Sequence, residues 1–211
     1  RISGLTQTER EKQQAIQVDA MALSAVRVAA MAPFAKRVAG QLRDLGMPHA
    51  KFIFGHAITE QPGPQGVDQI RALFSANADR APAPLDKVAS GGELSRVMLA
   101  LISLAADSQD LPTVIFDEID AGVSGEVADR VGTLMSCMGK QRQVLAITHL
   151  PQIASKAQNH LLVTKATSEN TVLTSISPLT MEQRVEAIAQ MLSGRKLTKA
   201  ALENARVLLK G

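Results

Sequence analysis

The first part of the chain carries an apolar residue at every third or fourth position, a spacing that predicts a long helix over residues 5–45. Pro33 should kink or divide this helix because proline has no amide hydrogen to donate, and Gly46 and Pro48 should end it. The first twenty residues are polar and rich in glutamine, so we expect them to add little to a core, as at the end of a coiled coil or at a fraying terminus. The apolar stripe consists of Leu23, Val26, Ala30, Phe34, Val38, Leu42 and Leu45.

An antiparallel hairpin is expected after this helix. Extended segments at 51–58 and 67–75 flank the turn-rich stretch 61–64, whose Gln-Pro-Gly-Pro sequence makes a long loop. Residues 78–87 contain three alanines and two prolines and are predicted to form a loop.

Strands and helices then alternate. Helices are predicted from Gly92 to about Ala106 and from Ser124 onward, and short apolar strands at 113–116 and 144–147. Short apolar strands separated by helices indicate an α/β fold with a mostly parallel sheet flanked by helices. We therefore expect two parts, a helical coiled-coil stub over residues 1–45 and an α/β domain over 46–211.

The end of the chain shows a second hairpin pattern and two closing helices. The predicted strands are 161–165 and 171–177, and the helices begin at Thr180 and Thr198. Gln183 stands three residues after Thr180, which completes the pattern of a capping box.

Composition narrows the class of protein. Of 211 residues, 45% are apolar and 20% charged, which argues against disorder. No apolar run approaches the roughly 18–20 residues of a membrane span, so we expect no membrane partner. There is no signal segment, and the lone Cys137 has no partner for an internal disulfide, so we expect a cytoplasmic protein. The missing initiator methionine favours a piece of a longer chain.

Charge gives little support for direct nucleic-acid binding by this segment. The whole net charge of +3 lies in residues 1–45, with seven basic residues against four acidic ones. The chain has no Trp or Tyr and five Phe, so stacking platforms for single strands are missing. Solvated surface charge is the simpler interpretation.

The first candidate for chemistry is the stretch Ser90-Gly91-Gly92-Glu93 at a predicted helix start. Glycines allow close approach of a ligand to the backbone, and a helix N-terminus offers free N–H groups to an anion such as phosphate. An ordinary helix cap with flexible glycines is the alternative, and on these four residues alone it is the better one.

The second candidate is the pair Asp117 and Glu118, which follows a strand-like apolar run. Ligands bind at the carboxyl ends of parallel strands. One carboxylate can hold Mg²⁺ and the other can orient an attacking water. The alternative is a capping Asp beside a surface Glu.

The third candidate is His149, which with Thr148 follows the next predicted strand and should lie at the same sheet edge as Asp117. It could donate a hydrogen bond to a phosphoryl oxygen, whereas His49, His56 and His160 are read as structural. All three candidates occur in order within sixty residues. Three unrelated motifs would rarely occur in this order by chance.

Residues 88–154 resemble the second half of an ABC-type ATPase head. The stretch 90–96 resembles the signature motif of that family, 113–118 resembles Walker B, and His149 matches the switch histidine. The stretches 88–96, 115–120 and 147–154 are almost identical to those of the RecN family of bacterial DNA repair proteins, relatives of the structural maintenance of chromosomes proteins. The resemblance extends from residue 45 through the closing helices.

The resemblance implies a role for each candidate. Asp117 would hold Mg²⁺, Glu118 would polarise the attacking water, and His149 would contact the γ-phosphate of ATP. Ser90, Gly91, Gly92 and Glu93 would belong to the signature that meets ATP held by a second copy of the head. The dimer-contacting loop would comprise Asp120, Ala121 and Gly122, although Ala-Gly-Val-Ser stands at 121–124 where the family usually has Ser-Ala-Leu-Asp.

No P-loop occurs in the sequence. The pattern Gly-x-x-x-x-Gly-Lys-Ser/Thr is absent, and the single Gly-Lys pair, at 139–140, is followed by Gln141. In the resembling family the P-loop lies in an amino-terminal lobe beyond the coiled coil, so we expect that lobe as a partner and DNA binding through the complete protein. A transport-type ABC motor and a non-catalytic coiled-coil scaffold remain the alternatives.

Overall fold

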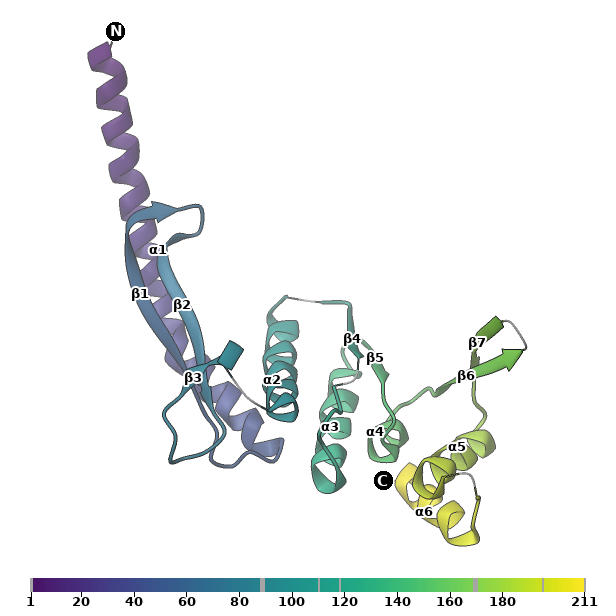
Figure 1. The fold of residues 1–211 in the computed structure, drawn as a ribbon. Helices are drawn as coiled ribbons and strands as arrows, with labels where there is room; N and C mark the ends of the chain where they lie inside the picture. Colours follow the sequence, from purple (N-terminus) through teal and green to yellow (C-terminus); the bar gives the residue numbers. More distant parts are fainter. Residues whose placement is uncertain are drawn as a thin grey trace. The chain divides into compact units, whose positions relative to one another are not determined.

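The chain divides into two compact units, residues 1–100 and 101–211. The computed structural model describes residues 2–87, 90–109, 111–117, 119–168, 171–194 and 196–210, and its elements are drawn in Figure 1. A domain boundary at residue 45 stays a prediction. The elements are, in order, α1 (Ile2–Asp44), β1 (Lys51–Gly63), β2 (Gly66–Ser75), β3 (Ala83–Pro84), the 3-10 helix η1 (Leu85–Lys87), α2 (Gly91–Gln109), β4 (Thr113–Asp117), α3 (Gly125–Met138), β5 (Gln143–Ile147), α4 (Pro151–Ser155), β6 (Leu161–Ser168), β7 (Thr171–Pro178), α5 (Met181–Ser193) and α6 (Lys199–Lys210).

The helix α1 is continuous, so Pro33 does not divide it, and the alternative that Pro33 kinks it stays a prediction. Proline removes one N–H donor, and the backbone bonds on either side still hold the turns together. The helix ends as predicted at Gly46, whose φ of 80° few other residues adopt. The Gly46 amide donates to Arg43 O and the Met47 amide to Leu42 O, which is the Schellman arrangement.

The second half of α1 packs against the β1–β2 hairpin, whereas residues 4–19 are exposed (Figure 1). The Phe34 ring on α1 lies 6.1 Å from that of Phe54 on β1. The buried residues of this unit include Val38, Leu42, Leu45, Phe52, Val67 and Phe74. The polar start of the helix therefore adds nothing to this core, as its composition indicates.

The first hairpin is tighter than the sequence indicates. Residues 61–63, expected in a long loop, belong to β1, and the register is irregular between Ile58 and Gly63. The turn consists of Pro64 and Gln65, after which Gly66 has φ of 94°. Residues 78–87, expected as loop, contain β3 and η1, and β3 pairs with β2. Backbone pairing between neighbouring strands thus overrode the local turn signals.

In the second unit, β4 and β5 form the predicted parallel pair, with Val114 opposite Val144 and Phe116 opposite Ala146. Val114 and Phe116 are buried. The short helix α4 was not predicted, and it lies against α3 where Gly132 has no side chain. A Cβ at Gly132 would stand 3.1 Å from the carbonyl oxygen of Gln152, so the glycine permits this close approach.

The end of the chain follows the sequence prediction. β6 and β7 form an antiparallel hairpin. α5 begins with the predicted capping box, in which the Gln183 amide donates to Thr180 Oγ1 and the Thr180 amide donates to Gln183 Oε1. α5 and α6 pack on α4 around a small apolar cluster of Ala154, Ile188, Ala189, Ala201 and Ala205.

The expectation that no segment of the chain is apolar enough to span a membrane was too strong. By length and composition, the segment Gly4–Asp44 of α1 could cross a membrane. Its middle is rich in alanine, and Arg27 is the one basic residue between residues 13 and 35. Long helices of other kinds satisfy the same test, and the second half of α1 packs on β1 and β2.

Candidate functional site

The carboxyl ends of β4 and β5 lie at one edge of their sheet. Asp117, the last residue of β4, pairs with Ile147, the last residue of β5, so the segments that begin at residues 119 and 148 start side by side. The sequence predicted this arrangement for Asp117 and His149. Glu118, the expected water-polarising residue, lies outside the described residues.

Asp120 connects these two segments. It is 2% exposed, and its Oδ2 accepts hydrogen bonds from Thr148 Oγ1 at 2.5 Å and from the His149 amide at 3.2 Å. The His149 ring atom Nδ1 stands 3.3 Å from the same oxygen. The sequence assigned Asp120 to a dimer-contact loop and gave no sign of these bonds, because they depend on which strand pairs with β4.

The rest of that loop is exposed at its tip. Ala121 and Gly122 face solvent, and Gly122 has φ of 74°, which favours glycine. Val123 is buried, and its amide donates to Asp120 O at 3.2 Å. Ser124 is the N-cap of α3 but makes no side-chain capping bond. Of the three residues predicted to contact a second copy, Ala121 and Gly122 are therefore accessible, whereas Asp120 is buried.

His149 presents its ring to solvent, with 77% of the side chain exposed. Its backbone is held by Asp120, and Thr148 Oγ1 also accepts from the Leu150 amide at 3.0 Å. Pro151 then opens α4. The histidine thus stands on a fixed backbone with an open side, as a residue that contacts a bound ligand requires.

The signature-like residues lie at the start of α2. The Leu94 amide donates to Ser90 O at 3.0 Å, and Gly91 is the first helical residue. Ser90 and Gly91 are exposed, and a Cβ at Gly91 would meet nothing within 4 Å. Gly92 and Glu93 are half-buried in the first helical turn. An anion could reach the free amides there. These four residues belong to the first unit and the sheet edge to the second, so each is described by itself.

The residues at the sheet edge fit a Mg²⁺ ion that a nucleotide also holds. Among the described residues no group of three or more His, Cys, Asp or Glu could enclose a metal ion. Mg²⁺ is commonly bound by one or two carboxylates, with phosphate oxygens and water completing the octahedron. The exposed carboxylate of Asp117 meets that requirement.

In the described part of the second unit, one face of the β4–β5 sheet is exposed. Ile115 is 64% exposed, and its pairing partner Leu145 and the next residue on that face, Ile147, are also exposed. Parallel sheets are normally covered on both faces. The uncovered apolar face lies directly beside Asp117.

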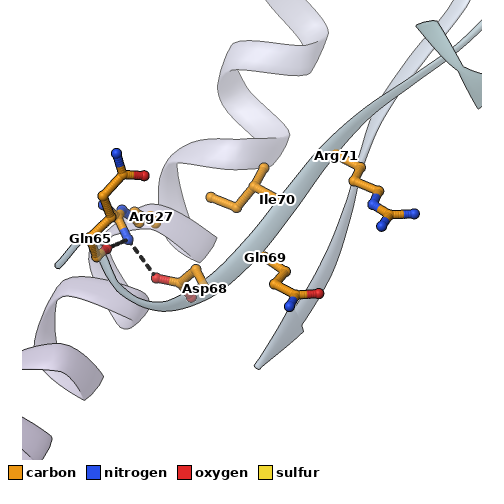
Figure 2. Close-up of a pocket in the computed structure, with 6 residues that line it drawn as sticks. All are labelled: Arg27, Gln65, Asp68, Gln69, Ile70 and Arg71. Atoms are coloured by element: carbon orange, nitrogen blue, oxygen red, sulfur yellow. Dashed lines mark hydrogen bonds and ion pairs between the residues drawn. The ribbon is translucent and has the colours of Figure 1, made fainter. Parts of the chain in front are cut away.

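A second polar cluster, which the sequence did not indicate, joins α1 to the first hairpin. The buried carboxylate of Asp68 on β2 accepts from Ser24 Oγ at 2.5 Å and from Arg27 Nη1 at 2.9 Å, and it lies 2.7 Å from His56 Nε2. Figure 2 shows Arg27 reaching Asp68 and the carbonyl of Gln65 together. The hydrogen bonds from Ser24 and His56, with Arg27, lower the pKa of Asp68 from 3.8 to about 2.

Comparison with known proteins supplies the family. No family model matches the chain. It is 42% identical over 190 residues to the DNA repair protein RecN of Deinococcus radiodurans, and 36% identical over 206 residues to that of Haemophilus influenzae. These matches cover 90% and 97% of the chain. The chain belongs to the RecN family. It spans about a third of the length of these relatives, 33% and 37%.

Solved structures of other proteins share its fold. The head domain of Smc with a coiled coil and joint from Pyrococcus yayanosii aligns with 92% of this chain and 33% of its own, with a TM-score of 0.58 and 22% identity. A structure of an SMC ATPase, described for its ATP-driven dimerization, aligns with 82% of this chain and 99% of its own, at a TM-score of 0.55 and 17% identity. These likenesses confirm the predicted α/β head fold with a long N-terminal helix.

Proposed function

We propose that this RecN-family chain forms one lobe of an ATP-hydrolysing head in a DNA repair protein. The observation that carries the proposal is the parallel pairing of β4 with β5, which brings Asp117 and the segment of His149 to one sheet edge. Ligands of parallel α/β sheets bind at that edge. We infer ATP as the ligand from the family, and the residues at this sheet edge are suited to binding its phosphates.

The chemistry is phosphoryl transfer to water, in which positioning and charge stabilisation do most of the work. Asp117 would hold Mg²⁺, and that ion would supply charge neutralisation for the phosphates. Glu118 polarises the attacking water, and the exposed ring of His149 donates to the γ-phosphate. Ser90, Gly91 and Gly92 contribute a hydroxyl and open backbone amides to a phosphate at the start of α2, with Glu93 in the first turn.

Two copies of the head are needed for a complete site in this proposal. The signature residues of one copy face the ATP held by the other, and the exposed loop residues Ala121 and Gly122 touch the opposite copy beside Asp120. Closing two heads around ATP and opening them after hydrolysis would move the coiled-coil arms that begin with α1. The complete protein would thereby grip or bridge DNA in the cytoplasm.

The P-loop comes from another segment in this proposal. The sequence has no Gly-x-x-x-x-Gly-Lys-Ser/Thr, and the relatives are about three times as long as the chain. The uncovered face of Ile115, Leu145 and Ile147 supports the need for a further lobe, because an exposed apolar face beside the reaction site would be covered there. An amino-terminal lobe of the same protein is the proposed occupant.

The test is Glu118→Gln in the complete protein, measured by ATP turnover and by ATP binding. Turnover should fall on the order of 100-fold or more because a positioned base is lost, while ATP binding stays. Glu203→Gln, on the exposed face of α6, is the matched control and should change neither. Unchanged turnover in Glu118→Gln would contradict the catalytic assignment and leave the scaffold interpretation.

A transport-type motor is the second candidate from the same fold, and Glu93 argues against it because transporters usually carry Gln at that place. The effect of added DNA on ATP hydrolysis distinguishes a repair ATPase from a transport motor. The repair ATPase should hydrolyse ATP faster when double-stranded DNA is added, whereas a transport motor should not respond.

A further inference from the structure

One oxygen of a buried carboxylate receives three contacts that join the two segments following β4 and β5. The oxygen is Asp120 Oδ2, and its neighbours are Thr148 Oγ1 at 2.5 Å, the His149 amide at 3.2 Å and His149 Nδ1 at 3.3 Å. Asp120 is 2% exposed. A buried carboxyl group is costly unless hydrogen bonds satisfy it, and these donors satisfy one of its oxygens.

The hydroxyl of Thr148 acts as both donor and acceptor between Asp120 and Leu150. A hydroxyl has one hydrogen to donate. Thr148 Oγ1 gives that hydrogen to Asp120 and accepts from the Leu150 amide at 3.0 Å. Residues 148–150 are therefore tied by hydrogen bonds to the carboxylate that follows β4.

The nearness of Nδ1 to the carboxylate bears on the form of the imidazole ring. A carboxylate can only accept, so a neutral ring that bonds to Asp120 through Nδ1 carries its proton on Nδ1. Nε2 then lies on the open side of a side chain that is 77% exposed.

We propose that Asp120 is the positioning residue of His149: it fixes the ring tautomer and couples the loop of residues 120–124 to the histidine. The inference rests on the proposed function, in which His149 contacts the γ-phosphate. Asp120 itself touches no substrate. Because the same loop carries the exposed Ala121 and Gly122, a contact made there by a second copy would reach His149 through Asp120.

The first test reads the tautomer directly. The complete protein, labelled with ¹⁵N in histidine, contains His149 among its ring signals, and His149→Gln assigns that signal. Long-range ¹H–¹⁵N spectra should show the proton on Nδ1 in the unmodified protein and a shift toward Nε2 in Asp120→Asn. Asp79→Asn, an exposed carboxylate, is the control and should leave the signal unchanged. The same tautomer in the Asp120→Asn variant would overturn the proposal.

The second test asks whether Asp120 acts through His149. Asp120→Asn should lower kcat on the order of 10- to 100-fold, as loss of an orienting partner does elsewhere, with the ATP KM unchanged. The double variant Asp120→Asn with His149→Gln should be no slower than His149→Gln alone. In this proposal Asp120 affects turnover only by positioning His149, so its loss has no further effect once the histidine is absent. Multiplied losses in the double variant would overturn the proposal.

Thr148 provides a milder variant that keeps the buried charge. Thr148→Ser retains the hydroxyl and should keep kcat and the tautomer, whereas Thr148→Val should move both in the direction of Asp120→Asn. Equal behaviour of the two Thr148 variants would contradict the coupling. If His149→Gln keeps full turnover while Glu118→Gln loses it, the proposed function stands and this inference fails.

Discussion

Asp68 shows how much one buried side chain can do for the attachment of α1. Its carboxylate has no exposed surface and joins Ser24 and Arg27 on α1 to His56 on β1. Removal of one partner from such a group leaves the others unpaired, which costs more than the bond itself contributes. Asp68→Asn should therefore weaken the packing of α1 on the hairpin.

Protonation of Asp68 at low pH should also lower the stability of the folded protein. The folded pKa of Asp68 is lowered from 3.8 to about 2, so the unfolded chain binds more protons between these values. The stabilisation is fully present above the unfolded pKa and is lost as pH falls from about 5 toward 2. Urea unfolding between pH 2 and 6 should show this slope in the unmodified protein.

The control for the acid effect is Asp68→Asn, in which this part of the pH slope should be missing. Asp79→Asn, at an exposed position in the same unit, should retain it. An equal slope in all three proteins would contradict the lowered pKa of Asp68.

Single histidines were harder to classify from the sequence. His56 was read as structural, and it does pair with Asp68. His160 was read the same way; it is half-buried, and burial, with the nearby Arg184, lowers its pKa below 6.5. Neither contact follows from neighbouring residues in the sequence, because both partners lie in other elements. The link between Asp120 and His149 was missed for the same reason.

At the scale of elements, close packing of α3 on α4 depends on Gly132. A Cβ there would stand 3.1 Å from Gln152 O, from Ile153 Cα and from a side-chain carbon of Lys156. Two of these atoms are backbone and must move with α4. Gly132→Ala should destabilise the protein by about 1–3 kcal/mol, the usual cost of overpacking, measured by urea unfolding.

Gly40→Ala is the matched comparison within a helix. A Cβ at Gly40 in α1 would meet nothing within 4 Å, and alanine is the better helix former by about 0.5–1 kcal/mol. This variant should therefore stabilise the protein. Equal effects in both variants would show that the α3–α4 contact is looser than the structure describes.

Local patterns predicted the elements whose signals lie within one segment. The apolar periodicity of α2 and α3 and the Thr180–Gln183 capping box are such signals, and all three were confirmed. The extension of β1 through Pro62 was missed because strand pairing overrode the turn residues. The five-residue α4 is too short to show a period. Among the candidate residues, the edge position of Asp117 and His149 was predictable from strand order alone.

At the scale of the whole molecule, the sequence contains no P-loop, which the proposed ATP site needs. We expect the 211-residue chain alone to hydrolyse ATP negligibly, because no lysine-bearing loop holds the phosphates. Addition of the amino-terminal lobe should restore turnover. The measurement is phosphate release with and without that lobe, and Glu118→Gln is the control that should stay inactive. Robust turnover by the chain alone would contradict the proposal that an amino-terminal lobe contributes the P-loop.

The anchoring of α1 has a mechanical consequence. The helix is held at Ser24 and Arg27, while its first turns make no contact with the hairpin (Figure 1). At 1.5 Å per residue, the stretch from Ser24 back to Ile2 is a rod of about 33 Å. A tilt of about 10° at the anchor would swing its tip by about 6 Å, a displacement that follows from the same rise per residue. A small change in the bonds to Asp68 would therefore be enlarged at the exposed end of α1.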